Sequence, residues 1–184
     1  MMARCLFLIG FTAALLTAFG CSNGDVTTAP PALACADGGQ AGANSVTMNC
    51  AAATDSTTEQ VDVMIGGPAT GSTSLRGLNF DVTYDPAHLE FVPAGSYTSP
   101  LFPGALVAVT LSGGQQGRVV VSIQQVAGSA ASDVTPGPHP VISLSFRTVA
   151  GVTFGATPLM FENAEATTAS SVIGFTNGLA LSYL

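Results

Sequence analysis

The chain beyond residue 45 alternates between apolar and polar residues with a period of two. This is the pattern of β-strands that have one side in a core and the other in water. It is clearest in four segments, 61–65, 78–84, 119–123 and 142–146. No stretch after residue 21 has the apolar spacing of a long amphipathic helix. The pattern therefore predicts an all-β domain.

Turn-forming residues separate these segments. Gly, Pro and Asp occur together at residues 66–68, 85–86, 113–114 and 136–138. Asn177-Gly178 favours a tight type I′ hairpin between the flanking segments, 171–176 and 179–183. About nine short strands result, and this number at regular spacing indicates a sandwich or barrel.

The N-terminal segment has the order of a secretory signal. Arg4 precedes an uncharged apolar run over 5–19, and Gly20-Cys21 follows. The run is shorter than the about 20 residues that span a bilayer. We therefore expect residues 1–20 to be a signal peptide that is removed on export, to the cell envelope or to the medium.

Residues 18–21 (AFGC) resemble the lipobox of bacterial lipoproteins. The resemblance implies that Cys21 carries diacylglycerol and becomes the mature N-terminus, and this lipid would be the only contact with a membrane. An ordinary cleaved signal is the alternative. The small, polar, proline-bearing sequence that follows suits a flexible tether. We expect lipid attachment and tether over 21–44, and one folded domain over 45–184.

The composition excludes nucleic acid as a partner. Only 8% of the residues are charged, against about 25% in an average soluble protein. Loss of Arg4 with the signal leaves three arginines, no lysine and eleven acids, which shifts the formal charge from −7 to −8. Binding to phosphates needs clustered Lys and Arg.

Cys35 and Cys50 remain after the signal and Cys21 are set aside. A lone pair of cysteines in an oxidising compartment usually forms a disulfide. A metal site is the competing interpretation, but neither cysteine has a CxxC partner or a nearby histidine. We therefore predict a Cys35–Cys50 disulfide.

Candidate catalytic residues are few. His88 and His139 fall in expected connections, and no G-x-S-x-G turn supplies a nucleophile for either. Glu162 and Glu165 could form an acid pair for glycoside hydrolysis, but nothing distinguishes them from solvated surface. Asp85 starts an Asp-Pro turn, in which its side chain should bind neighbouring N–H groups. We predict that the chain is not an enzyme.

We also expect no cofactor and no metal of its own. The D-x-[DN]-x-[DN]-G loop is absent and the acids are scattered. An aromatic platform for sugars is weakly supported, because the chain has no Trp and three Tyr, of which Tyr84 is in phase with core positions.

Residues 78–92 (LNFDVTYDPAHLEFV) look like the signature of bacterial cohesin modules, in which an alternating strand runs into a Tyr-Asp-Pro turn and a short second strand. Residues 117–125 resemble the central strand of such a module. Residues 141–148 (VISLSFRT) resemble another of its strands, and Asn177-Gly178 precedes the closing strand. The resemblance covers residues 45–184.

This resemblance implies a nine-stranded jelly-roll β-sandwich that binds a calcium-loaded dockerin on one sheet face, with the calcium carried by the partner. The strand before the Tyr-Asp-Pro turn and the central strand would lie on that face. Their outward positions include Gly77 and Arg118, and the residues that we predict to bind a partner are Asn79, Asp81, Thr83, Val120, Ser122 and Gln124. The alternative is that these residues are only the solvated side of a sheet.

Three functional hypotheses follow. The first is a non-catalytic, envelope-anchored recognition module of cohesin type that binds a dockerin-bearing protein in polysaccharide degradation. The second is a carbohydrate-binding sandwich that acts directly on glycan. The third is a purely structural envelope lipoprotein.

Overall fold

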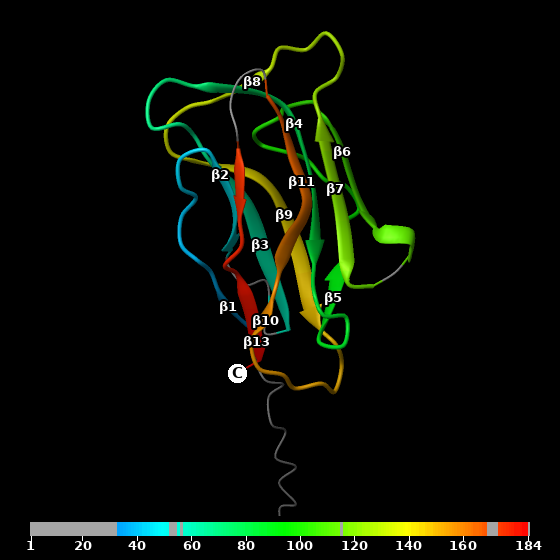
Figure 1. Ribbon diagram of the computed structural model, residues 1–184. Coiled ribbons are helices and arrows are strands. Elements are labelled where there is room, and N and C mark those ends of the chain that lie inside the picture. Colours follow the sequence, from blue (N-terminus) through cyan, green and yellow to red (C-terminus); the bar gives the residue numbers. More distant parts are fainter. Residues whose placement is uncertain (1–32, 52–54, 56, 115, 169–172, 184) are drawn as a thin grey trace, which may run out of the picture.

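Two β-sheets pack face to face in the computed structural model, which describes residues 33–51, 55, 57–114, 116–168 and 173–183 (Figure 1). We name the sheets after their long strands. The β4 sheet has the order β11 (Met160–Thr168), β4 (Thr73–Thr83), β7 (Arg118–Gln124) and β6 (Leu106–Leu111), and β8 (Ser132–Val134) also pairs with β4. The β3 sheet has the order β12 (Gly174–Thr176), β2 (Ser45–Cys50), β3 (Thr58–Gly66), β9 (Pro138–Thr148) and β5 (Leu89–Val92).

A third, small sheet lies at one end of the sandwich. It has the order β1 (Leu33–Ala36), β13 (Ala180–Tyr183) and β10 (Thr157–Pro158). Both β1 and β10 pair antiparallel with β13. The sheet therefore brings the first and the last described strands of the chain side by side.

The prediction of an all-β sandwich is confirmed. The described residues contain thirteen strand segments instead of about nine, and three of the additional ones, β8, β10 and β12, are only two or three residues long. Besides strands these residues form one 3₁₀ turn, Ser112–Gly114. No helix within this part of the chain is long and apolar enough to cross a bilayer.

The core lies between the two sheets and follows the predicted alternation. Val61, Val63 and Ile65 of β3 are fully buried, whereas the intervening residues are half-buried. Phe80 and Phe161 pack edge to face with ring centroids 5.3 Å apart. This burial of apolar side chains from both sheets is the main stabilisation of the sandwich.

The packed structure begins before residue 45, so the tether predicted over 21–44 extends too far. Leu33 is 5% exposed, and β1 pairs with β13 from Leu33 to Ala36. Cys35 of this strand forms a disulfide with Cys50 of β2, with their Cα atoms 5.8 Å apart. The strand is four residues long and reads LACA, which is too short to show alternation. Cys21 and residues 1–20 lie outside the described residues.

The prediction of a type I′ hairpin at Asn177-Gly178 is wrong. β12 pairs parallel with β2 and β13 pairs with β1, so the chain crosses between sheets at this point. Positive φ angles, which a type I′ turn requires at both central residues, do not occur at Asn177 or Gly178. The Asn177 side chain instead accepts a hydrogen bond from the Phe161 N–H at 2.7 Å. Residues 171 and 172, where the first strand of that hairpin was expected to begin, lie outside the described residues.

Candidate functional site

The outer face of the β4 sheet carries all six residues predicted to bind a partner. We call the outward-facing side chains of β11, β4, β7 and β6 the β4 face. Asn79 lies opposite Ser122, Asp81 opposite Val120, and Gly77 opposite Gln124, while Thr83 ends the row on β4. The register therefore joins these positions into one patch on two adjacent central strands, β4 and β7 (Figure 1).

The two outer strands extend this patch on both sides. On β11, Glu162 pairs with Asp81 and Glu165 with Asn79. On β6, Thr110 pairs with Val120 and Ala108 with Ser122. Side chains in such cross-strand rows are close enough to contact one another. The β4 face is thus four strands wide.

Asp81 is the most enclosed of the six predicted residues. It is 7% exposed, and its Oδ2 forms an ion pair with Arg118 Nε at 3.1 Å and accepts a hydrogen bond from Asn163 Nδ2 at 2.7 Å. The Arg118 guanidinium also forms an ion pair with Glu162. Asp81 therefore faces outward as predicted, but its carboxylate is already bonded within the chain.

A β-bulge in β11 places Asn163 over Asp81. The register between β11 and β4 shifts between Glu162 and Glu165, and Asn163 has a φ of 47°. Asn tolerates this left-handed conformation better than most residues. The bulge turns the amide side chain towards the neighbouring strand. An irregularity of this kind leaves no sign in the alternation of the sequence.

Asn79 and Ser122 form the polar centre of the face. The Ser122 hydroxyl donates to Asn79 Oδ1 at 2.7 Å, and both residues are half-buried. Within the described chain nothing accepts a hydrogen bond from Asn79 Nδ2, so its two N–H groups can reach an acceptor on a docked protein. This is the donor that the face offers at its middle.

Two apolar side chains lie at opposite corners of the face. Leu106, on β6 in the row of Gly77 and Gln124, is 69% exposed. Met160, on β11 opposite Thr83, is 44% exposed. Sequence reasoning missed both, because it did not show that β6 and β11 flank the two central strands. The face therefore combines a polar centre with an exposed apolar side chain at each of two corners.

The histidines and the acidic pair make local contacts. His88 Nδ1 lies 3.3 Å from Asp85 Oδ2, and its ring stacks on Phe154 at 4.7 Å. Asp85 accepts from the Ala87 N–H at 2.9 Å, as predicted for the Asp-Pro turn. His139 Nε2 lies 2.8 Å from the carbonyl oxygen of Thr135. These contacts hold connections between strands. In the described part of the chain, no three His, Cys, Asp or Glu side chains gather as metal ligands would.

Solved structures share the fold of this chain. No protein-family model matches it, and no curated protein matches its sequence. The sixth cohesin of scaffoldin B from Acetivibrio cellulolyticus, solved in complex with a mutant Cel5 dockerin, has a TM-score of 0.55 and 19% identity, over 73% of this chain and 95% of that one. A cohesin module of a family 33 glycoside hydrolase from Clostridium perfringens has a TM-score of 0.51 and 8% identity. The match covers 84% of this chain and 96% of that module.

A type I cohesin of ScaB from Pseudobacteroides cellulosolvens is also similar, with a TM-score of 0.52 and 15% identity over 73% of this chain and 88% of that chain. These identities are low, so the likeness concerns the fold. The chain has the jelly-roll sandwich of cohesin modules.

Proposed function

We propose that the chain is a non-catalytic recognition module of cohesin type, which binds a dockerin-bearing protein through the β4 face. The observation that carries this proposal is the likeness of the sandwich to a cohesin that was solved with a dockerin bound. A second such likeness, at a TM-score of 0.53, is to the cohesin of the CaDoc0917–CaCohA2 complex.

The chemistry of the β4 face supports a protein partner. Three of its charged residues, Asp81, Arg118 and Glu162, are paired with one another, so docking over them leaves none of these three charges unpaired. Asn79 offers free donors at the centre, and Leu106 offers apolar area at one corner. A protein interface combines an apolar contact area with a limited number of hydrogen bonds in this way.

The partner's calcium provides a control for specificity. The resemblance to cohesins implies a partner that is a calcium-loaded dockerin, whereas the described part of this chain gathers no cluster of acidic ligands. Binding should therefore be lost when a chelator removes calcium from the partner, without any change in the fold of this chain.

The proposal includes an anchor at the cell envelope and a role in polysaccharide degradation. A lipid on Cys21 would fix the chain to a membrane, and the residues before β1 would hold the β4 face away from it. Intact mass spectrometry of the membrane-extracted protein tests the anchor. A diacylglyceryl addition on an N-terminal Cys21 is expected, and a free thiol at Cys21 would rule it out.

Isothermal titration calorimetry with the dockerins encoded in the same genome tests the binding. The wild-type chain should bind at least one of them with calcium present and none in excess EDTA. Ser122→Arg places a bulky cation at the centre of the face and should abolish binding. Ser145→Arg, at a half-buried outward position of β9 on the other sheet, is the matched control and should bind as the wild type does. The absence of heat with every dockerin would contradict the proposal.

A further inference from the structure

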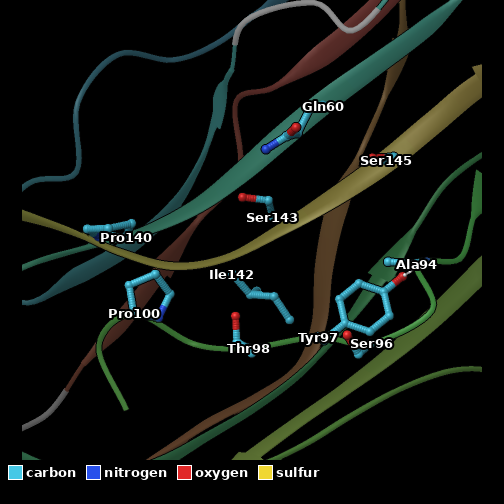
Figure 2. A pocket seen from close by; sticks show the side chains of 10 residues that line it. All are labelled: Gln60, Ala94, Ser96, Tyr97, Thr98, Pro100, Pro140, Ile142, Ser143 and Ser145. Carbon is cyan, nitrogen blue, oxygen red and sulfur yellow. Dashed lines mark hydrogen bonds between the residues drawn. The ribbon is translucent and has the colours of Figure 1, made fainter. Parts of the chain in front are cut away.

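A pocket of about 310 Å³ lies on the other side of the molecule, against the β3 sheet (Figure 2). β5 pairs with β9 only from Thr148 to Ser145, so the remainder of this edge of β9 has no neighbouring strand. The segment after β5, residues 93–105, follows this edge without backbone hydrogen bonds to it. The space between the segment and the strand is the pocket.

The segment that forms one wall is held firmly. Phe102 inserts into the core and is 1% exposed, and its N–H donates to the Ser99 carbonyl at 3.2 Å. The Tyr97 hydroxyl accepts from the Ala94 N–H at 2.8 Å, which fixes the orientation of the ring. The pocket is therefore already formed before any ligand arrives, and a ligand need not order the loop.

Neutral polar groups line the pocket. They come from three segments, with one amide from β3, two hydroxyls from β9 and two hydroxyls from the 93–105 segment, and they belong to Gln60, Ser143, Ser145, Ser96 and Thr98 (Figure 2). The hydroxyls of Ser96, Thr98 and Ser145 have no hydrogen-bond partner among the described residues. None of the described residues that line the pocket is charged.

Asp62 of β3, which lies opposite Ser143 of β9, sets the hydrogen-bonding character of this wall. The Ser143 hydroxyl donates to Asp62 Oδ1 at 2.5 Å, and Gln60 Nε2 donates to the same oxygen at 3.4 Å. Because a carboxylate only accepts, these bonds fix the direction of both donors. They leave the Ser143 oxygen and the Gln60 carbonyl oxygen free to accept from a ligand. The wall thus suits a ligand with many O–H donors.

We propose that this pocket binds a neutral sugar residue of a glycan. Its volume is at the small end of the range of ligand sites, about 300 to 1,000 Å³, which fits a ligand of monosaccharide size. The hydroxyls and the amide match sugar hydroxyls, and Tyr97 and Ile142 provide apolar contact for C–H groups. The site does not depend on the β4 face, so this proposal stands apart from the proposed function.

Nuclear magnetic resonance titration of the full chain with neutral oligosaccharides tests the site. The probes are cellohexaose, xylohexaose and mannohexaose, each raised to about 10 mM, the range of weak single-site affinities. At least one should shift the backbone amide signals of Ser143, Ser145 and Thr98. Saturable shifts at these residues support the proposal, and no shift with any of the three probes overturns it.

Variants assign the binding to the pocket. Ser145→Leu fills the space and Tyr97→Ala removes the ring, and each should weaken binding by about tenfold or more, equal to about 1.4 kcal/mol. Ser122→Arg, on the opposite face, is the control and should leave sugar binding unchanged. Far-ultraviolet circular dichroism confirms that each variant is folded. Unchanged sugar binding in a folded Ser145→Leu protein would overturn the proposal.

A charged sugar tests the selectivity. The carboxylate of Asp62 is bonded to Ser143 of the wall, and no cation among the described residues lines the pocket, so hexagalacturonate should bind more weakly than the neutral probe. Equal or tighter binding of hexagalacturonate in the pocket would contradict the proposed ligand class.

Discussion

Glu59 is an acid in an inward-facing position of β3. It lies opposite Phe146 of β9 and is 4% exposed. Burial disfavours the carboxylate, so it raises the pKa of Glu59 above its ordinary value of 4.5. The unfolded chain therefore ionises at lower pH than the folded one. The stability that results is fully present below the ordinary pKa and is lost as pH rises through the raised pKa.

Glu59→Gln should accordingly be more stable than the wild type at pH 7, and the difference should shrink towards pH 4. Urea unfolding at both pH values measures it. Glu90→Gln is the control, because Glu90 is partly exposed and its carboxylate accepts two hydrogen bonds from Arg147 at 3.0 Å. Loss of that pair should not stabilise the protein. An equal effect of Glu59→Gln at pH 4 and pH 7 would contradict the assigned cause.

Arg118 keeps the enclosed carboxylate of Asp81 neutralised. Arg118→Met should destabilise the protein by about 1 to 3 kcal/mol, less than the about 3 to 5 kcal/mol for breaking a fully buried pair, because the Arg118 side chain is 36% exposed. Chemical denaturation at pH 7 measures the loss. Adding Asp81→Asn to Arg118→Met should recover part of it, since the amide needs no counter-charge. No recovery in the double variant would show that the pair is not the cause.

The outward orientation of Asp81 and Asn79 could be predicted from the period of two, because the pleat alone determines it. The enclosure of the Asp81 carboxylate could not be predicted from the sequence. It depends on Asn163, which is brought over the carboxylate by a bulge in a strand far along the chain. Contacts of this kind depend on the register between neighbouring strands, and the pairing of all strands in the sheet determines that register.

At the scale of elements, the disulfide ties β1 to the body of the sandwich. Cys35 and Cys50 are separated by 15 residues, and a cross-link over such a loop contributes about 3 kcal/mol in the chain-entropy model. Cys35→Ala with Cys50→Ala should lose about this amount in urea unfolding. Dithiothreitol should destabilise the wild type to a similar extent and leave the double variant unaffected. A wild type insensitive to reduction would contradict the predicted contribution.

The long strands could be predicted and the short ones could not. β3, β4, β7 and β9 have enough residues for alternation to emerge, and their inward apolar residues are buried, although the outward Asp81 of β4 is enclosed as well. β1 and β10 are too short for any pattern and form only because β13 offers both of its edges. The prediction of a hairpin at Asn177-Gly178 failed for a related reason. The turn preference of a dipeptide is a local property, whereas the crossover between sheets depends on the pairing of distant strands.

At the scale of the whole molecule, the sandwich presents two faces with different chemistry. The β4 face has an ion pair between Asp81 and Arg118, a polar centre and apolar corners, which suit a folded protein. The pocket beside β9 is small, neutral and rich in hydroxyls, which suits a sugar. The fold class was readable from the sequence, because strand alternation and turn residues recur along the chain. The groups that gather on each of the two faces could not be read from the sequence, because they depend on which strands become neighbours.

Backbone amide mapping with a calcium-loaded dockerin tests the proposed function most directly. A dockerin that binds in calorimetry is added to the isotope-labelled chain. The signals of Asn79, Val120 and Ser122 should shift or broaden, while those of Gln60 and Ser145 on the other sheet should remain in place. Perturbations confined to the β3 sheet, or none at saturating dockerin, would contradict recognition through the β4 face.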